Sequence, residues 1–189
     1  MPISTITRAE SSKHNGTVVP ADHAQTQEFG LARQVSLALD EGSALASIDS
    51  LNQLLADTLT LRDLYKKHHW QASGPTFYMV HLLFDKHAGE QGELADTIAE
   101  RVQTLGGVSI AMAADVAETT AIPRVPKGRE DTITQFKRLI HAHEVILLGC
   151  RAMANDTAKS GDMGTNDIIV SKVLRKNELQ SWFLTEHIR

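Results

Sequence analysis

Five side chains in the middle of the chain have the types and the spacing of a metal site. They are two imidazoles and three carboxylates: His69, His81, Asp85, Asp96 and Glu100. His81 and Asp85 are four residues apart, as are Asp96 and Glu100, so each pair lies on one side of a helix if this segment is helical. Imidazole nitrogens combined with carboxylate oxygens suit iron, manganese or zinc, and suit copper(I) or calcium poorly.

The same segment carries an apolar stripe that is typical of an amphipathic helix. On a helical wheel this stripe predicts the face that packs into the bundle core: Val80, Leu83, Phe84, Leu94, Ile98, Val102 and Leu105. The four candidate ligands between residues 81 and 100 are centred about 160° away from it. We therefore expect them to form a second, polar face that does not line the core of their own bundle.

The spacing of the two pairs favours a site that is shared by two chains. At about 1.5 Å of rise per residue, the pairs are about 16 Å or more apart, which is too far to share one ion. A two-fold axis between residues 90 and 91 places the partner's Asp96 opposite Asp85. The same axis places the partner's Glu100 opposite His81 and creates two identical sites per dimer.

These polar residues could also form an ordinary solvated helix face with incidental ion pairs. Three features favour a site: the self-complementary spacing, the His69 imidazole from the preceding helix end, and two glycines near the axis, Gly89 and Gly92. Glycine inside a helix costs about 1 kcal/mol relative to alanine, so both indicate close packing of helices. The sequence contains no Glu-x-x-His, the signature of a di-iron site inside one bundle.

Apolar periodicity and turn residues predict four long helices. Their expected ranges are about 40–71, 76–105, 131–158 and 167–187. The breaks between them contain Gly74-Pro75, Gly106-Gly107 and the predicted turn "KSGDMGTND" at 159–167. A short extra helix fits within 108–121, in the long connection between the second and third helices. The fold class that follows is all-α, with a four-helix bundle over residues 41–189.

Residues 1–40 contain few apolar side chains and predict a mobile N-terminal tail. Val35, Leu37 and Leu39 alternate within it, which indicates a short extended segment. The first 28 residues hold two basic and three acidic side chains, and the whole chain has a net charge of −4. This balance argues against strong attraction to nucleic acid or to anionic membranes.

The composition is typical of a globular protein in a reducing compartment. The single Cys150 excludes an internal disulfide, and no apolar run reaches the ~18–20 residues of a membrane span. The N-terminus lacks the apolar core of a signal peptide. We therefore expect a cytoplasmic protein without membrane contact, in which Cys150 is an inert core residue.

Two stretches resemble the paired signature of the Dps proteins, the miniferritins named as DNA-binding proteins from starved cells. They are "HWQASGPTFYMVHLLFD" (69–85) and "ADTIAERVQTLGGVS" (95–109). The resemblance extends over about residues 45–189, and the first motif departs from the family only at Ala72, a packing position. It implies a ferritin-like four-helix subunit, a hollow dodecameric shell and a ferroxidase centre at the dimer interface.

Carried over by position, the resemblance assigns His69, His81 and Asp85 to one subunit and Asp96 and Glu100 to its two-fold partner. The helical wheel predicts the same arrangement. The resemblance further implies that Fe(II) is oxidised there, by hydrogen peroxide in preference to dioxygen, and that ferric mineral is stored in the shell. The ligand set would also accept zinc or manganese.

The alternative function is that of a structural, nucleoid-associated DNA-binding protein with little ferroxidase activity. Relatives that bind DNA do so through basic tails that contact the phosphates. The tail of this chain is slightly acidic, so we expect weak or absent DNA binding and rank iron oxidation and storage first.

Other residues have both a chemical and an ordinary structural interpretation. Trp70 matches a family aromatic that is thought to take up stray oxidising equivalents, and it would equally serve as an interfacial packing residue. Three aspartates flank the turn before the fourth helix. They either line an acidic pore, as this region does in the family, or act as helix caps and turn residues: Asp156, Asp162 and Asp167.

The remaining histidines have mixed expectations. His68 is expected to cap a helix end or to face solvent. His87 falls in the apolar stripe and is expected to be a hydrogen-bonded core residue rather than a ligand. The "HAHE" segment could bind an extra metal, although its two histidines point to different faces of a helix: His141, His143 and Glu144.

Overall fold

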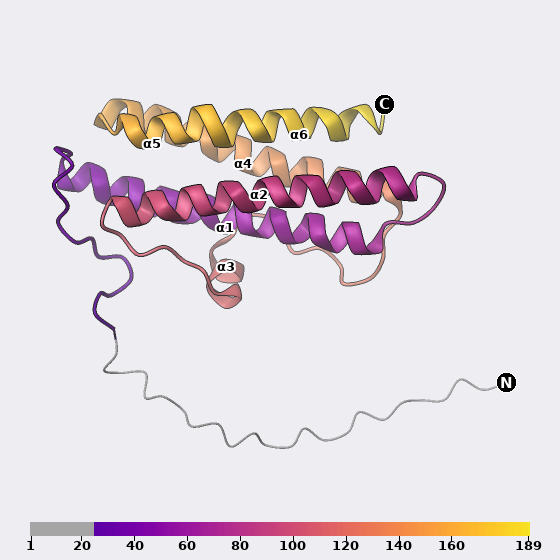
Figure 1. Cartoon of the computed structure of the whole chain (residues 1–189), viewed down its shortest axis with the longest axis horizontal. Helices are drawn as coiled ribbons and strands as arrows, with labels where there is room; N and C mark the ends of the chain where they lie inside the picture. Colours follow the sequence, from indigo (N-terminus) through magenta and orange to yellow (C-terminus); the bar gives the residue numbers. More distant parts are fainter. Residues whose placement is uncertain (1–24) are drawn as a thin grey trace, which may run out of the picture.

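The computed structural model describes residues 25–189 (Figure 1). The tail predicted for residues 1–40 therefore lies largely outside the described residues. Within the described residues all regular secondary structure is helical and no strand forms, which confirms the all-α fold class. No helix of this described part is long and apolar enough to cross a membrane.

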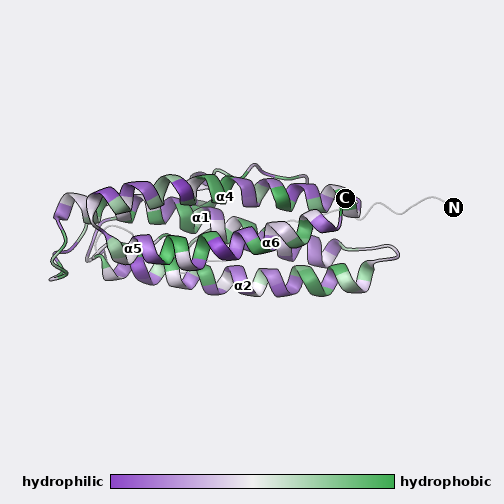
Figure 2. Cartoon of the chain, turned by 90° about the horizontal axis from the view of Figure 1, so that it is seen from above, coloured by the Kyte–Doolittle hydropathy of each residue, from purple (hydrophilic) through white to green (hydrophobic). Residues whose placement is uncertain are grey.

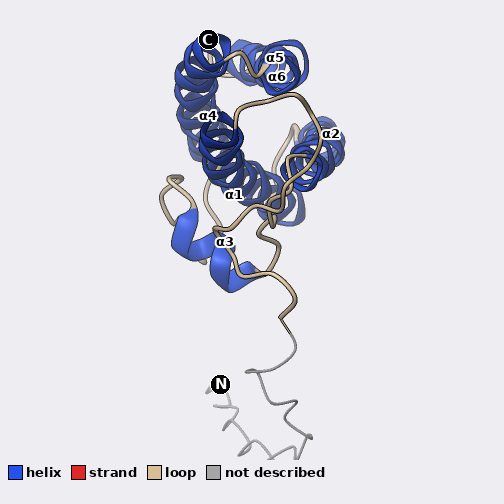
Figure 3. Ribbon diagram, turned by 90° about the vertical axis from the view of Figure 1, so that its left-hand side faces the viewer, coloured by secondary structure: helices blue, strands red, loops and turns tan. Residues whose placement is uncertain are grey.

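Four long helical rods lie side by side (Figures 1 and 3). Three of them are α1 (Glu41–Gln71), α2 (Phe77–Thr104) and α4 (Thr132–Ser160). The fourth rod consists of three consecutive segments: α5 (Met163–Asp167), the π-helical η2 (Ile168–Leu174) and α6 (Arg175–Glu186). The short α3 (Ala113–Thr119) lies outside the bundle against α1, in the connection where an extra helix was predicted. The predicted four-helix bundle is confirmed.

Aspartate carboxylates cap the start of α1, α4 and α5. The carboxylate of Asp40 accepts a hydrogen bond from the Ser43 backbone N–H at the start of α1. Asp162 does the same for Thr165 at the start of α5, at 3.0 Å. The fourth rod thus begins at Met163 and not near residue 167. The predicted turn over 159–167 is wrong, because only Gly161, with φ of 78°, and Asp162 separate the third rod from the fourth.

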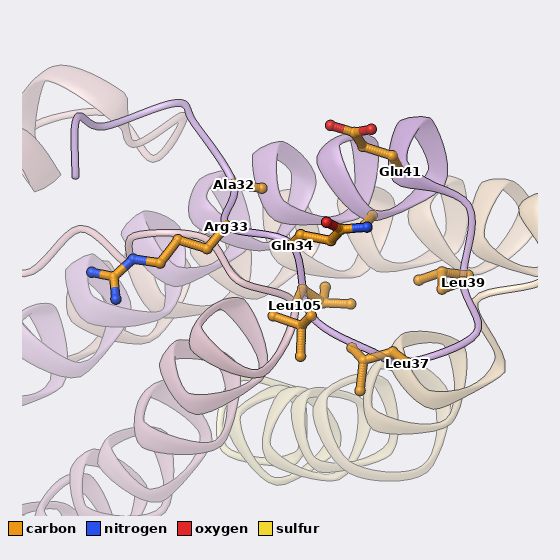
Figure 4. A pocket seen from close by; sticks show the side chains of 9 residues that line it. Ala32, Arg33, Gln34, Leu37, Leu39, Glu41 and Leu105 are labelled. Atoms are coloured by element: carbon orange, nitrogen blue, oxygen red, sulfur yellow. The ribbon is translucent and has the colours of Figure 1, made fainter.

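Residues 25–40 do not form a strand but run as a strap beside the end of α2. The Arg33 N–H donates to the Gly106 carbonyl at 2.8 Å, and the Gln27 side chain donates to the same oxygen at 2.9 Å. Ala38 has a φ of 53°, which interrupts the extended pattern. Figure 4 shows the strap around a small pocket that Leu105 also lines.

The core is built from the apolar faces of the four rods, and Figure 2 shows polar and apolar stretches alternating along each rod. The predicted stripe of α2 is buried except for Leu83, which is partly buried: Val80, Phe84, Leu94, Ile98, Val102 and Leu105. Burial of each large apolar side chain contributes about 1.5–3 kcal/mol. The stripe therefore fixes the rotation of α2, and with it the direction of the opposite, polar face.

Candidate metal centre

His69 and His81 face each other across the turn between α1 and α2. Nδ1 of His69 donates to the His81 backbone carbonyl at 2.8 Å, and Nδ1 of His81 donates to the His69 carbonyl at 2.9 Å. The two rings stack with their centroids 3.7 Å apart and an interplanar angle of 21°. Since the proton of each neutral ring is on Nδ1, both Nε2 lone pairs are available to a metal ion.

Local structure explains this arrangement. His69 lies in the last turn of α1, where the backbone carbonyls receive no hydrogen bond from the helix itself. The His69 carbonyl is therefore free to accept the hydrogen bond from the His81 ring. Gly74, with φ of 93°, allows the tight turn that brings the two helices together. The two histidines are half-buried, which keeps their rings ordered while leaving one edge accessible.

Asp85 lies one turn after His81 on the same face of α2. Its Oδ1 is 3.9 Å from Nε2 of His69 and 2.5 Å from Nζ of Lys66. The hydrogen bond from the Lys66 ammonium holds the pKa of Asp85 below its usual value, so the carboxylate is ionised at neutral pH. Lys66 therefore occupies one oxygen of the carboxylate, Oδ1, and would compete there with a bound cation.

Asp96 and Glu100 remain apart from the histidines. Both are exposed further along α2, and neither side chain has a hydrogen-bond or ion-pair partner within residues 25–189. In this described part of one chain, no three His, Cys, Asp or Glu side chains are arranged to hold a metal ion. We refer to the three candidate ligands at the junction of α1 and α2, His69, His81 and Asp85, as the half-site, and its completion by a second chain remains a prediction.

Exposed apolar side chains surround this half-site. Trp70 is 72% exposed, and Tyr78 and Leu82 lie on the open face of α2 at 70% and 48%. Further along the same face, a Cβ added to Gly89 would meet no atom within 4 Å. Tyr78 and Leu82 are four residues apart on one face of α2, and exposed apolar neighbours of this kind favour a contact surface.

Lys66 is the residue of the half-site that sequence reasoning missed. It precedes His69 by three residues and therefore lies on the same side of α1, which is the only signal in the sequence. Lysine is so common on helix surfaces that this spacing alone does not single it out. The contact with Asp85 joins residues nineteen positions apart and depends on how α1 and α2 pack.

One histidine prediction is wrong and another is confirmed. His68 neither caps α1 nor faces solvent: it is fully buried against Phe84, and burial lowers its pKa to about 4. His68 lies on the same helix face as the buried Leu61 and Leu64. This face packs into the core up to the end of α1, so His68 is buried although it is close to the helix end. His87 is buried and hydrogen-bonded as expected, with Nδ1 3.0 Å from the Tyr65 hydroxyl.

The "HAHE" residues and Cys150 also behave as the helical pattern predicts. His141 is exposed, 3.6 Å from Glu144, whereas His143 is buried on the opposite face. The three possible ligands of an extra metal are therefore not brought together. Cys150 is buried, and burial raises the pKa of its thiol to about 12, which makes it an inert core residue.

Of the three aspartates near the fourth rod, Asp162 has a structural role. It is buried, caps α5 and accepts from the Arg101 guanidinium at 2.6 Å. Asp156 and Asp167 are exposed and make only local contacts, with Lys159 at 3.6 Å and with the Ser171 hydroxyl at 2.7 Å. A pore lined by these two remains a prediction about an assembly.

The fold and the comparison with family models define a ferritin-like protein. A family model described as a ferritin-like domain matches residues 48–189, which include three of the rods whole and all of α1 except its first seven residues. The chain is 31% identical over 142 residues to the "DNA protection during starvation protein" of Agrobacterium fabrum, covering 75% of this chain and 87% of that protein.

Solved structures agree with this classification. DpsC from Streptomyces coelicolor is 54% identical, with a TM-score of 0.86 over 87% of this chain and 96% of that chain. An archaeal Dps homologue from Halobacterium salinarum is 24% identical and supports the fold, with a TM-score of 0.85 over 90% of this chain and 94% of that chain. The chain belongs to the Dps family of ferritin-like proteins, and the resemblance seen in the two sequence motifs is confirmed.

Proposed function

We propose that this chain is a ferroxidase and iron-storage subunit whose metal centre is completed by a second copy of itself. The observation that carries this proposal is the reciprocal lock between His69 and His81. It commits the Nδ1 atoms of both rings to hydrogen bonds, and Nε2 of His69 lies 3.9 Å from Oδ1 of Asp85, with exposed apolar side chains such as Tyr78 on the same helix. Such a half-site has a donor set suited to Fe(II) but too few ligands to hold it alone.

The missing ligands are available on the same helix of a second copy. In an antiparallel pair of α2 helices, the partner's Asp96 faces Asp85 and the partner's Glu100 faces His81. The open backbone at Gly89 lies close to the axis of this pair and removes a steric obstacle to it. The apolar side chains beside the histidines, Trp70 and Tyr78 among them, would be covered by the same contact.

Iron is the substrate of the proposed reaction. Two Fe(II) ions give one electron each to hydrogen peroxide, whose O–O bond breaks, and two protons from solvent complete two water molecules. Because both electrons reach the same peroxide, no hydroxyl radical is released. The ferric product hydrolyses and is stored as mineral inside a hollow dodecameric shell, which protects a cytoplasm exposed to peroxide.

The name of the Agrobacterium relative supports a second candidate, protection of DNA by direct binding. The whole chain carries 19 basic and 23 acidic side chains, which argues against a strong phosphate-binding surface. We therefore rank DNA binding second. A gel-shift titration with plasmid DNA at low salt and neutral pH separates the two, and a clean shift would reverse the ranking.

Stopped-flow oxidation of Fe(II), loaded anaerobically and mixed with peroxide or dioxygen, tests the proposed function. The assembled wild-type protein should oxidise Fe(II) far faster than buffer, and faster with peroxide. His81→Ala should lose most of this acceleration, whereas His141→Ala, an exposed histidine elsewhere, should keep it. Equal rates for the two variants would contradict the assignment of the centre.

A further inference from the structure

Buried polar side chains cross the bundle core one helical turn from the half-site. Tyr65 of α1 is fully buried, and its hydroxyl oxygen lies 2.6 Å from Nε2 of His143 on α4. The same oxygen lies 3.0 Å from Nδ1 of His87 on α2. Nδ1 of His143 lies in turn 2.8 Å from Oδ1 of Asn177 on α6. The phenol thus sits between two imidazoles, and all four rods contribute to the group.

The orientation of the Asn177 amide determines the direction of each hydrogen bond in this group. The amide nitrogen of Asn177 donates to the Val173 backbone carbonyl at 2.8 Å, within the π-helical segment η2. This orientation presents Oδ1 to His143, so Nδ1 of that ring must carry the proton and donate it. Nε2 of His143 is then a lone pair that accepts the Tyr65 O–H. Because Tyr65 donates its hydroxyl proton to His143, its oxygen acts as the acceptor toward His87, whose Nδ1–H is the donor.

Burial prevents simple ionisation of this pair. It raises the pKa of Tyr65 well above its ordinary value and lowers the pKa of His143 to about 3. At neutral pH the pair is a phenol and a neutral imidazole. A phenol that loses an electron becomes a strong acid, so the proton can pass to the imidazole at that moment and at no other.

We propose that Tyr65 is a one-electron donor to the metal centre and that Nε2 of His143 receives its proton. This inference rests on the proposed ferroxidase function. Tyr65 precedes His69 by one helical turn, about 6 Å along α1. The ring centroids of Tyr65 and Phe84 are 5.9 Å apart, and Phe84 is the residue immediately before Asp85 in α2. The donor therefore lies next to the centre while remaining shielded from solvent.

The electron is needed when peroxide meets a centre that holds only one Fe(II). Cleavage of the O–O bond to two waters takes two electrons and two protons. Fe(II) supplies one electron and becomes Fe(III). Tyr65 supplies the other and becomes a neutral phenoxyl radical, its own proton moving to His143, while solvent supplies the two protons of the waters. A later Fe(II) returns the electron, and His143 returns the proton to Tyr65.

Two other aromatic side chains close to the centre in sequence, Trp70 and Tyr78, are readily oxidised, and they provide controls. Trp70 is exposed, and no side chain within residues 25–189 acts as a base toward its indole N–H. Tyr78 is the second of the two tyrosines of the chain and is 70% exposed. Neither has the paired imidazoles that surround Tyr65, so neither should replace it as the donor.

Freeze-quench EPR tests the assignment. The assembled protein is loaded with about one Fe(II) per centre and mixed with hydrogen peroxide. A tyrosyl signal should appear in the wild type and in Tyr78→Phe, should keep its line shape in Trp70→Phe, and should be lost in Tyr65→Phe. Ring-deuterated tyrosine in the unmodified chain should narrow the signal, which identifies a tyrosyl radical even if the Tyr65→Phe chain does not assemble.

Two further readouts separate this role from a packing role. His143→Gln keeps a polar group but removes the base, so the tyrosyl yield should fall several-fold. In Tyr65→Phe, hydroxyl-radical adducts from spin trapping should rise, while oxidation of fully loaded centres stays within about twofold of wild type. An unchanged tyrosyl signal in Tyr65→Phe, or no signal from a wild type that oxidises iron, would overturn the inference. A wild type that oxidises no iron would instead overturn the proposed function.

Discussion

His69 and His81 hold each other's rings by donating from Nδ1 to each other's backbone carbonyl, at 2.8 and 2.9 Å. The same two hydrogen bonds tie the end of α1 to the start of α2. Ring orientation and helix packing are therefore one structural feature, and the free Nε2 atoms are positioned before any ion binds. A preorganised pair loses less conformational entropy on binding than two mobile side chains would.

Complementation between two inactive variants tests the intersubunit centre. His81→Ala and Glu100→Ala should each abolish most Fe(II) oxidation, because every centre of a homomer then lacks one ligand. When half the subunits of a mixed assembly carry each change, some centres combine an intact His81 with the partner's intact Glu100. Activity should recover to about one quarter of wild type.

The control for this experiment is the composition of the assemblies. Native mass spectrometry must show both chains in one particle, since separate homomers would give no rescue for a trivial reason. Mixed particles as inactive as the parent variants would mean that the centre is built within one chain.

Lys66 should compete with metal ions for Asp85. The ammonium lies 2.5 Å from Oδ1 of the carboxylate, so Lys66→Gln removes a cation that competes with an incoming ion. We expect Zn(II), used as a redox-inert probe, to bind several-fold more tightly to this variant in calorimetric titrations. Lys159→Gln, which loses an exposed ion pair in the last turn of α4, is the matched control. Weaker binding in Lys66→Gln would show instead that the lysine orders the site.

Gly106 should be intolerant of any side chain. Its φ is 88°, and an added Cβ would clash with the Arg33 carbonyl of the strap. Gly106→Ala should lower the free energy of unfolding by about 1–3 kcal/mol, because it strains the backbone and displaces the strap. Gly128→Ala has open space and no positive φ, so it should stay within about 0.5 kcal/mol of wild type. Denaturant unfolding measures both, and equal stabilities would contradict the role of the strap contact.

Asp162 should make stability depend on pH. Burial alone raises its pKa, but hydrogen bonds from Thr165 and the charge of Arg101 outweigh this effect and hold the pKa below its ordinary value of 3.8. The stabilisation is therefore complete above about pH 4 and is lost as the pH falls through the folded-state pKa. Asp162→Asn keeps a good helix cap but deprives the partly buried Arg101 of its carboxylate partner, which should cost about 1.5–3 kcal/mol at pH 7.

The difference in unfolding free energy between wild type and Asp162→Asn should shrink as the pH is lowered below 3.8. Asp156→Asn removes an exposed ion pair and should show no such dependence. A gap between wild type and Asp162→Asn that is constant from pH 7 to pH 3 would mean that the carboxylate charge is not what stabilises this corner of the bundle.

Local patterns in the sequence were enough to predict the rods and the half-site. The helical period of Leu and Val, the Gly74-Pro75 break and the i, i+4 pairing of His81 with Asp85 all act within one or two turns of chain. The prediction failed where a single capping residue outweighed the pattern. Asp162 starts the fourth rod near Gly161, although residues 159–167 read as a turn by composition.

The packing of the rods determined the contacts between residues that are far apart in the sequence. Lys66 contacts Asp85, Tyr65 contacts His143 across seventy-eight positions, and His68 is buried although its neighbour His69 is partly exposed. Such contacts depend on the rotation and spacing of whole helices, which are set by the summed burial of many side chains. The sequence by itself therefore determined which residues share a helix face, because that is local geometry. Only the tertiary structure decided which faces meet and which polar groups lose their water.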